Sequence, residues 1–399
     1  MIIDSGRVFR RMEHRSSEIR KQARGMISTE AIAAQKVSSV FRVVIATLVL
    51  ALTLGTGSEV TAADGDLSIS LSKPLKGYMA EIMGNGRYVY LEGGIDAQAG
   101  QRLESFLKKN DVPYTSTVVL DSPGGSLGAG MELGRVIRKY GLSTTVGRKE
   151  PHPAYDGVTA GECMSSCTLA YLGGTFRYLP AQSRFGVHRF YATKPSDLTA
   201  DTAQMLSAII VTYMKEMDID VELYRLSTLA GGDEIYDVPS ATLERLGVVN
   251  KGFERPKWTI EGNNDLIYLK GERNTAFGVN KFIIYCGSSQ PFLHVIFDPQ
   301  GRTEEVMNLN QHDLVIDGEN TPVTPNVKDI KNGWYNGVYN LNPRLLAAIA
   351  KAQTVGMMLR PTSQAPIFLG FDKLPLAGGE QKVRSYLSTC RRSQGAAAR

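Results

Sequence analysis

Several features that would assign a function directly are missing from this sequence of 399 residues. It has no internal repeat and no Gly-rich phosphate loop of the Walker type, so nothing in it indicates ATP hydrolysis. Cysteine, with four residues, and tryptophan, with two, are scarce. No close group of cysteine and histidine predicts a zinc site, and no cofactor is expected.

Excess charge of one sign is also absent from most of the chain. The formal net charge is +5, but residues 1–62 carry most of it and the remainder has a net charge of only +1. This balance does not indicate a basic surface for nucleic acid, and no nucleic-acid partner is expected. The length and the hydrophobic share of 43% allow a substantial buried core and predict two domains.

One uncharged apolar run lies near the N-terminus, at residues 43–54. It is shorter than the roughly 20 residues that span a bilayer. Lys36 and Arg42 precede it and Val60-Thr61-Ala62-Ala63 follows, an order typical of a secretory signal. We therefore expect residues 1–63 to form a leader and the protein to be periplasmic or secreted. It would be membrane-anchored only if the leader stays uncleaved.

The four cysteines then lie in a context where disulfides are permitted. We predict a bridge between Cys286 and Cys390, which would close a loop of about 100 residues and contribute roughly 4 to 5 kcal/mol in the chain-entropy model. Cys163 and Cys167 are four residues apart on a predicted helix, an unfavourable setting for a bridge. Free buried cysteine is a common small hydrophobe, so the state of this pair stays open.

Strand-like and helix-like segments alternate up to about residue 250. The expected strands are 87–91, 117–120, 143–146 and 184–188, and the expected helices are 97–108, 131–140, 163–172, 199–217, 221–229 and 239–246. This alternation predicts an α/β fold with a mainly parallel sheet over residues 64–252. Residues 148–161, with two prolines and two glycines, are expected to form an irregular loop.

The composition changes near residues 251–257, which marks a domain boundary. Beyond it we expect a smaller β-rich domain over residues 257–399. Its predicted strands are 266–269, 281–285 and 292–297, and its predicted helices are 343–355 and 380–389.

A glycine turn after the strand at 117–120 is the first candidate site feature. Pro123 ends the strand, and Gly124 and Gly125 allow positive φ and a close approach of another molecule to the main chain. Free N–H groups at the start of the following helix attract developing negative charge. An ordinary strand-to-helix turn would show the same residues.

Two further features follow along the chain. Ser165 and Ser166 precede an apolar helix, where a serine gains from the helix dipole or serves simply as an N-cap. His188 ends a predicted strand, and strand ends at the open side of a parallel sheet are where α/β sites form. A histidine in a strand can also be a structural group.

Together these segments resemble the Clp protease proteolytic subunit (ClpP) within the ClpP/crotonase superfamily. The resemblance rests on Gly94-Ile95-Asp96, the Ser-Pro-Gly-Gly-Ser turn at 122–126, the serine before the helix, and Leu179-Pro180, Ser183-Arg184 and His188. The pattern Cys-x-Ser-x-Cys at 163–167, together with a leader, resembles the exported ClpP-like proteins of bacteria. The resemblance to ClpP covers roughly residues 85–250 and implies a spiral of ββα units.

The resemblance also implies roles for individual residues. Ser165 matches the nucleophile, His188 the general base, and the N–H groups of Gly125 and Ser166 the oxyanion donors. The family acid precedes an aromatic residue and a short helix, which here points to Glu234 or Asp233. This chain has Glu234 where the family has aspartate, and one residue is inserted before the helix end.

The expected function is hydrolysis of short or unfolded peptides by a Ser-His-acid mechanism, without an ATPase partner. Homo-oligomers are common among ClpP-like folds and are possible here. The first alternative is a non-catalytic ClpP-fold peptide-binding or scaffold protein of the cell envelope. Acyl-CoA chemistry of the crotonase kind, and a Ser-Lys peptidase with Lys149 or another lysine as base, are further alternatives.

Overall fold

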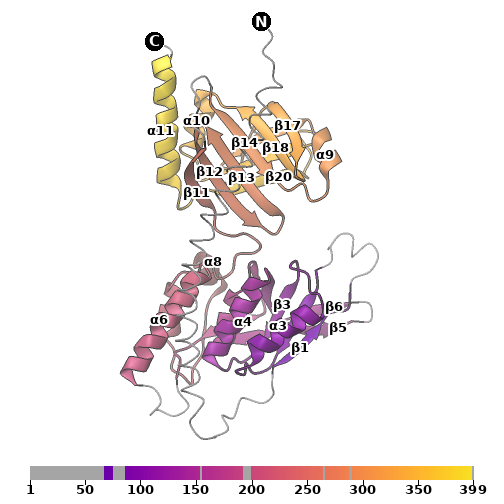
Figure 1. Ribbon diagram of the computed structural model, residues 1–399, viewed down its shortest axis with the longest axis vertical. Coiled ribbons are helices and arrows are strands. Elements are labelled where there is room, and N and C mark those ends of the chain that lie inside the picture. The colour runs from indigo at the N-terminus through magenta and orange to yellow at the C-terminus, as the bar shows by residue number, and fades with distance from the viewer. Residues whose placement is uncertain are drawn as a thin grey trace, which may run out of the picture. The chain divides into compact units, whose positions relative to one another are not determined.

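The computed structural model describes residues 67–74, 86–152, 155–191, 199–263, 266–286 and 290–397. The predicted leader at 1–63, with its apolar run at 43–54, lies outside these residues. The described part is mixed α/β with a β-rich C-terminal region (Figure 1). Its buried apolar side chains form two clusters, one drawn from residues 67–249 and the other from residues 258–390.

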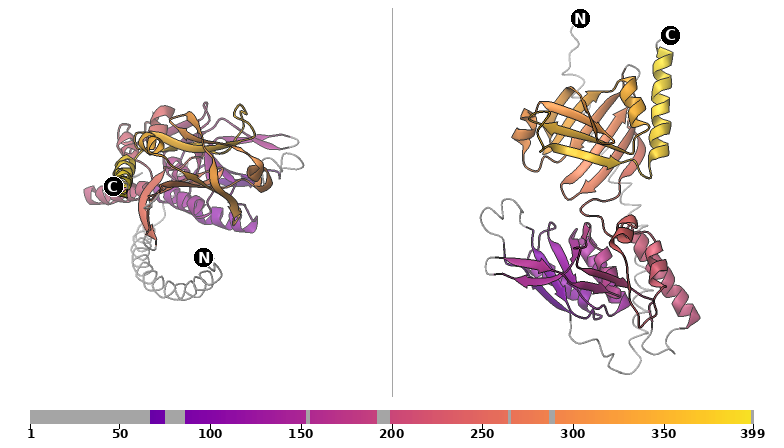
Figure 2. Two further views of the ribbon diagram at one scale, coloured as in Figure 1. Left: turned by 90° about the horizontal axis from the view of Figure 1, so that it is seen from above. Right: turned by 180° about the vertical axis from the view of Figure 1, so that it is seen from behind.

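A five-stranded sheet forms the centre of the first cluster. Its order is β1 (Ser68–Leu71), β2 (Tyr88–Glu92), β3 (Thr117–Asp121), β4 (Ser143–Val146) and β8 (Arg177–Tyr178). The last four strands run parallel and β1 joins them antiparallel. Helices α3 (Ala99–Lys109) and α4 (Leu127–Lys139) lie on one face of this sheet, as Figures 1 and 2 show. The predicted parallel arrangement is therefore present in this sheet.

A second, three-stranded sheet has the order β10 (Tyr236–Asp237), β9 (Arg184–Val187) and β7 (Glu162–Met164). The segment predicted as a loop at 148–161 instead contains a hairpin of β5 (Arg148–Pro151) and β6 (Asp156–Thr159). Four antiparallel pairs join the two strands, from Arg148 with Thr159 to Pro151 with Asp156, although the prolines and glycines of the segment had indicated a loop.

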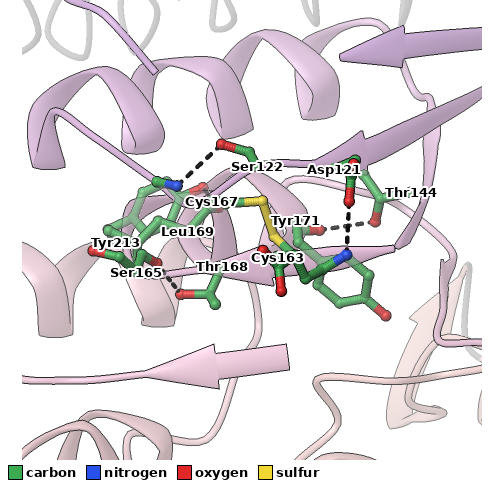
Figure 3. Close-up of a disulfide and its surroundings, with 12 residues drawn as sticks. Asp121, Ser122, Thr144, Cys163, Ser165, Cys167, Thr168, Leu169, Tyr171 and Tyr213 are labelled. Carbon is green, nitrogen blue, oxygen red and sulfur yellow. Dashed lines mark hydrogen bonds between the residues drawn. A yellow bond between two sulfur atoms is a disulfide. The ribbon is translucent and has the colours of Figure 1, made fainter. Parts of the chain in front are cut away.

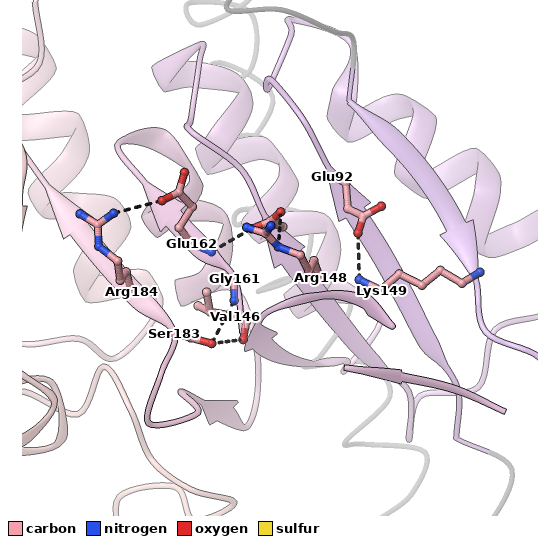
Figure 4. A network of polar contacts seen from close by, with 9 residues as sticks. Glu92, Val146, Arg148, Lys149, Gly161, Glu162, Ser183 and Arg184 are labelled. Atoms are coloured by element: carbon pink, nitrogen blue, oxygen red, sulfur yellow. Dashed lines mark hydrogen bonds and ion pairs between the residues drawn. The ribbon is translucent and has the colours of Figure 1, made fainter. Parts of the chain in front are cut away.

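Polar contacts tie the hairpin and the second sheet to the first (Figure 4). Glu92 accepts a hydrogen bond from the Lys149 backbone N–H at 2.9 Å. The Ser183 hydroxyl donates to the Val146 carbonyl at 2.9 Å. The first contact joins β5 to β2, and the second joins the chain leading into β9 to β4.

Four more helices complete this part of the chain: α5 (Ser166–Leu172), α6 (Ala200–Glu216), α7 (Glu222–Ser227) and α8 (Ser240–Arg245). The helix predicted at 163–172 begins only at Ser166, because Cys163 and Met164 pair with β9 as strand β7. A short apolar run has no period that separates a three-residue strand from the first turn of a helix.

Glycines let α4 and α5 pack at close range. A Cβ on Gly134 would overlap the Tyr213 hydroxyl and lie 2.8 Å from the Leu169 carbonyl oxygen. A Cβ on Gly130 would overlap the Ser166 carbonyl oxygen. The start of α5 is therefore held against α4.

Ser126 caps the N-terminus of α4 by accepting a hydrogen bond from the Ala129 N–H at 3.4 Å.

The C-terminal part is built from two antiparallel sheets over one core. The larger sheet has the order β11 (Lys257–Asn263), β12 (Leu266–Thr275), β13 (Gly278–Tyr285), β14 (Phe292–Phe297), β18 (Trp334–Asn340) and β17 (Pro325–Lys331). The smaller has the order β16 (Glu319–Pro322), β15 (Gln311–Ile316), β19 (Thr354–Arg360) and β20 (Leu369–Pro375), and is seen from behind in Figure 2.

Three helices accompany these sheets: α9 (Thr303–Asn308), α10 (Pro343–Ile349) and α11 (Glu380–Ala397). Figure 1 shows α11 beside β11. The helix predicted at 343–355 ends at Ile349, and residues from Thr354 onward join β19 instead. Among the helices of the described residues, none is both long and apolar enough to cross a membrane.

We expect Gly134→Ala to lower the free energy of unfolding by about 1 to 3 kcal/mol, because the added methyl group must displace the Tyr213 hydroxyl. Gly128 on the same helix is the matched control, since its Cβ would meet nothing within 4 Å. Gly128→Ala should be neutral or stabilising by up to about 1 kcal/mol. Urea unfolding of both variants measures this, and equal effects of the two substitutions would contradict the packing described.

Candidate active site

Ser165 lies at a sharp turn between β7 and α5. Its backbone dihedrals are φ 56° and ψ −128°, a combination that costs a residue with a Cβ on the order of 1–3 kcal/mol. Such a conformation persists only where the surrounding structure holds it. Strained strand-to-helix turns of this kind present a serine hydroxyl in serine hydrolases.

Backbone hydrogen bonds hold the turn on both sides. The Ser165 N–H donates to the Gly186 carbonyl in β9 at 2.9 Å, and the Met164 N–H donates to the Ser122 carbonyl at 3.0 Å. The Ser165 carbonyl accepts two hydrogen bonds from Thr168, at 3.0 Å from its N–H and at 2.6 Å from its hydroxyl. The turn is thus fixed to β9, to the chain after β3 and to the first turn of α5.

The imidazole of His188 lies against the Ser165 hydroxyl, with Nε2 2.7 Å from Oγ. This contact follows from the strand pairing, because Gly186, which accepts the Ser165 N–H, is two residues before His188. For Nε2 to accept the hydroxyl proton, the ring proton must sit on Nδ1. The structure therefore brings together the two residues that the sequence predicts as nucleophile and base.

Burial lowers the pKa of His188 below the ordinary imidazole value of 6.5, and the Arg189 backbone acts weakly in the opposite direction. Burial disfavours the charged imidazolium because it removes water from the ring. The imidazole is consequently uncharged at neutral pH and able to accept a proton.

In the part of the chain that the structure describes, no carboxylate is bonded to the other ring nitrogen. Among the described residues, the buried Nδ1 of His188 has no hydrogen-bond partner. Asp233 and Glu234 are both exposed, and Glu234 instead accepts a hydrogen bond from the Gly231 N–H at 3.3 Å within its own loop. The structure thus arranges Ser165 and His188 as a dyad and does not bring either predicted acid to it.

The glycine turn after β3 lies directly beside this dyad. A Cβ on Gly124, which has φ 101°, would come within 2.7 Å of both the Met164 carbonyl oxygen and the Ser165 Cβ. Only glycine lets the two turns approach this closely. The sequence alone indicated a turn at Gly124 but not that it would contact Ser165.

Gly125, which the resemblance names as an oxyanion donor, forms a parallel bridge with Ile95. The bridge uses the groups flanking Gly125: the Ile95 N–H donates to the Gly124 carbonyl and the Ser126 N–H donates to the Ile95 carbonyl, both at 2.8 Å. In a parallel ladder this leaves the N–H of Gly125 itself directed away from Ile95.

Ser166 supplies the second predicted donor. It is the first residue of α5, so its N–H has no acceptor in a preceding turn of the helix. Its hydroxyl is buried and, among the described residues, without a hydrogen-bond partner. It is the main-chain N–H of Ser166 that the resemblance assigns to the oxyanion.

A cavity of about 60 Å³ adjoins the Ser165 and His188 side chains. Its apolar lining comes from Leu127, Leu169, Val187, Phe190, Ile210, Met214 and Leu223. A small apolar group beside the nucleophile would be desolvated there. A larger hollow of about 880 Å³ lies in the C-terminal part, lined by residues of β15, β16, β17, β18 and α10 and their connections, but by no histidine or cysteine.

Lys149, the base of the Ser-Lys alternative, is engaged elsewhere. Its ammonium group lies 3.4 Å from the Asp156 carboxylate and 5.3 Å from the centre of the Tyr90 ring. The base in contact with the Ser165 hydroxyl is His188. The described residues also contain no group of three or more histidine, cysteine, aspartate or glutamate side chains that could hold a metal ion.

All four cysteines are paired. Cys286 is joined to Cys390, the predicted pair, with their Cα atoms 5.2 Å apart. Cys163 is joined to Cys167 across the turn that carries Ser165, also with 5.2 Å between Cα atoms (Figure 3). The expected obstacle to this second bridge does not arise, because Cys163 lies on β7 and only Cys167 lies on the helix. Two disulfides indicate a non-reducing compartment.

No family model matches the chain, and no curated protein does. Solved structures that it resembles include the ClpP protease catalytic domain from Plasmodium falciparum, at 16% identity over 40% of this chain and 81% of that one, with a TM-score of 0.29. Another is a ClpP1 mutant from Listeria monocytogenes, at 15% identity over 43% of this chain and 93% of that one, with a TM-score of 0.31.

The lowered pKa of His188 predicts the pH dependence of any reaction at Ser165. The rate of covalent labelling by a fluorophosphonate should rise with pH and level off, with a midpoint below 6.5, because the protonated imidazole cannot accept the hydroxyl proton. Labelling rates measured from about pH 4 to pH 8 test this. A midpoint above 6.5 would contradict the lowered pKa that burial gives this imidazole.

The exposed positions of Asp233 and Glu234 generate a second prediction. Asp233→Asn and Glu234→Gln should each leave the labelling rate within about threefold of the wild-type rate, because neither carboxylate contacts His188. An acid that orients the histidine would show a loss of about 10⁴-fold instead. Such a loss in either variant would show that a triad forms in the working protein.

Proposed function

We propose that residues 64–252 form an exported ClpP-like serine hydrolase, with the ββα spiral of the ClpP/crotonase superfamily, that cleaves short or unfolded peptides. The observation that carries the proposal is the 2.7 Å contact between Ser165 Oγ and His188 Nε2 at a positive-φ turn. A serine held in this conformation against an uncharged imidazole is the arrangement of an activated nucleophile.

The chemistry follows from the positions of these groups. His188 Nε2 takes the hydroxyl proton as Ser165 Oγ attacks the peptide carbonyl, and the N–H groups of Gly125 and Ser166 bind the resulting oxyanion. The intermediate collapses as His188 gives its proton to the leaving amine. Water then attacks the acyl group on Ser165 by the same steps and releases the acid.

The surroundings of the dyad support a peptide substrate with a small apolar side chain next to the cleaved bond. The adjoining cavity, at about 60 Å³, has mostly apolar walls. The two disulfides and the secretory pattern at residues 43–54 support action outside the reducing cytoplasm, where ATP and an unfolding partner are not expected.

One observation favours the alternative of a non-catalytic peptide-binding or scaffold protein. The Nδ1 atom of His188 has no hydrogen-bond partner among the described residues, so no carboxylate there stabilises an imidazolium. Removing the orienting acid from a triad lowers kcat by about 10⁴-fold. A dyad of this kind would therefore be slow unless the turn itself supplies the missing positioning.

Labelling of the purified protein by a fluorophosphonate separates the two functions. We expect the wild-type protein to react at Ser165, and Ser165→Ala to lose at least about 10³-fold of the rate because no nucleophile is left. Fragmentation mass spectrometry locates the modified residue. The matched control is Ser240→Ala, an exposed serine of α8, which should react like the wild type. Folded wild-type protein that stays unlabelled would favour the scaffold.

A further inference from the structure

The disulfide between Cys163 and Cys167 encloses the nucleophile (Figure 3). Only Met164, Ser165 and Ser166 lie between the two cysteines. This short loop therefore contains the reacting hydroxyl and one of the two oxyanion donors. The bridge runs from the strand before the turn to the helix after it, so it spans the residue with the strained backbone.

Each cysteine is anchored to a different part of the core. Cys163 pairs with Phe185 of β9 and bridges to Ser122 after β3. Cys167 belongs to α5, which packs on α4 through Gly130. Both cysteines are fully buried. The bridge thus connects the sheet that carries His188 to the helix that begins with Ser166.

The length of the loop separates this bridge from the other one. Cys286 and Cys390 are 104 residues apart, whereas Cys163 and Cys167 are separated by four. Closing a long loop restricts the unfolded chain far more than closing a short one. The short bridge therefore adds less to global stability, and its main effect falls on the local backbone geometry.

The site needs such a constraint because the usual positioning group is missing. No carboxylate of the residues that the structure describes is bonded to His188 Nδ1, so the contact between Ser165 and His188 depends on the backbone that carries the serine. Residues in this region of φ and ψ relax unless neighbouring structure prevents it.

We propose that the Cys163–Cys167 disulfide is a positioning element that holds Ser165 in its positive-φ conformation against His188. This inference rests on the proposed function for its consequence in catalysis. Without the bridge the turn relaxes, the hydroxyl leaves the imidazole and the Ser166 N–H turns away from the oxyanion. The protein stays folded but loses its reactivity.

The test compares two double variants of the full chain, Cys163→Ala with Cys167→Ala and, as the matched control, Cys286→Ala with Cys390→Ala. The first should lose at least about 10-fold of the maximal rate of fluorophosphonate labelling, with little change in the half-saturating concentration. The control should keep its labelling rate within about threefold but show the larger drop in unfolding temperature. Circular dichroism checks that both fold.

Two results overturn the proposal. One is a labelling rate of the Cys163→Ala, Cys167→Ala protein that lies within threefold of the wild-type rate. The other is an equal loss of labelling in both double variants, which would make the effect one of general stability. We expect loss of the short bridge to lower mainly the labelling rate, and loss of the long bridge to lower mainly the unfolding temperature. A purely structural role of the short bridge would not produce this difference.

A crystal structure of the Cys163→Ala, Cys167→Ala protein keeps this inference separate from the proposed hydrolase. If the wild-type protein is not labelled, the proposed hydrolase function is wrong, and the crystal structure alone decides whether the disulfide positions Ser165. Positioning by the bridge predicts that Ser165 moves to negative φ and that Oγ leaves hydrogen-bond distance of Nε2. An unchanged turn contradicts it.

Chemical reduction gives the same test if that variant does not fold. In the Cys286→Ala, Cys390→Ala protein only the short bridge remains. Dithiothreitol transfers two electrons and two protons to it, giving two thiols, while the reagent closes to its cyclic disulfide. Labelling should fall in proportion to the thiols counted by mass spectrometry and return after reoxidation with glutathione disulfide. Complete reduction with an unchanged rate would overturn the proposal.

Discussion

The backbone of Ser165 is the constraint on which the site depends. Its positive φ turns the chain from β7 into α5 and presents the hydroxyl to His188 instead of burying it in the helix start. The hydrogen bond from its N–H to Gly186 sets the distance to the imidazole, and the close approach of Gly124 sets the distance to the glycine turn. Three separate segments of the chain therefore meet here: the turn from β7 into α5, the chain at Gly186 and His188, and the glycine turn at Gly124.

The electrostatics of the site are those of a neutral pair. The imidazole is partly buried, which favours its uncharged form, and no carboxylate among the described residues stabilises the protonated form. The resemblance assigns the stabilisation of a developing oxyanion to the main-chain N–H groups of Gly125 and Ser166. Positioning of the backbone consequently matters more here than in a site with a charged third member.

The order of motifs predicted a large part of this arrangement. The β-branched run before Pro123, the paired glycines and the strand ending near His188 indicated the right elements, because each has a local physical signature. The dyad could be expected from a resemblance that joins these motifs. The six-stranded sheet of the C-terminal part was visible only as separate apolar runs, since strand order depends on long-range pairing.

Other features could not be read from the sequence. Strand β7 has only three residues and continues into an apolar helix, so its period was hidden and the bridge between Cys163 and Cys167 looked unfavourable. The acid was assigned from its distance to an aromatic residue, a criterion that does not say whether Glu234 points toward the histidine or into solvent. Such orientations are fixed by loop packing, which no short sequence pattern predicts.

The most direct measurement is a crystal structure of the protein after reaction with a fluorophosphonate. The account predicts a covalent bond from Ser165 Oγ to phosphorus, with a phosphoryl oxygen about 2.7–3.1 Å from the N–H groups of Gly125 and Ser166. An unmodified Ser165, or a phosphoryl oxygen that contacts neither N–H group, would contradict it.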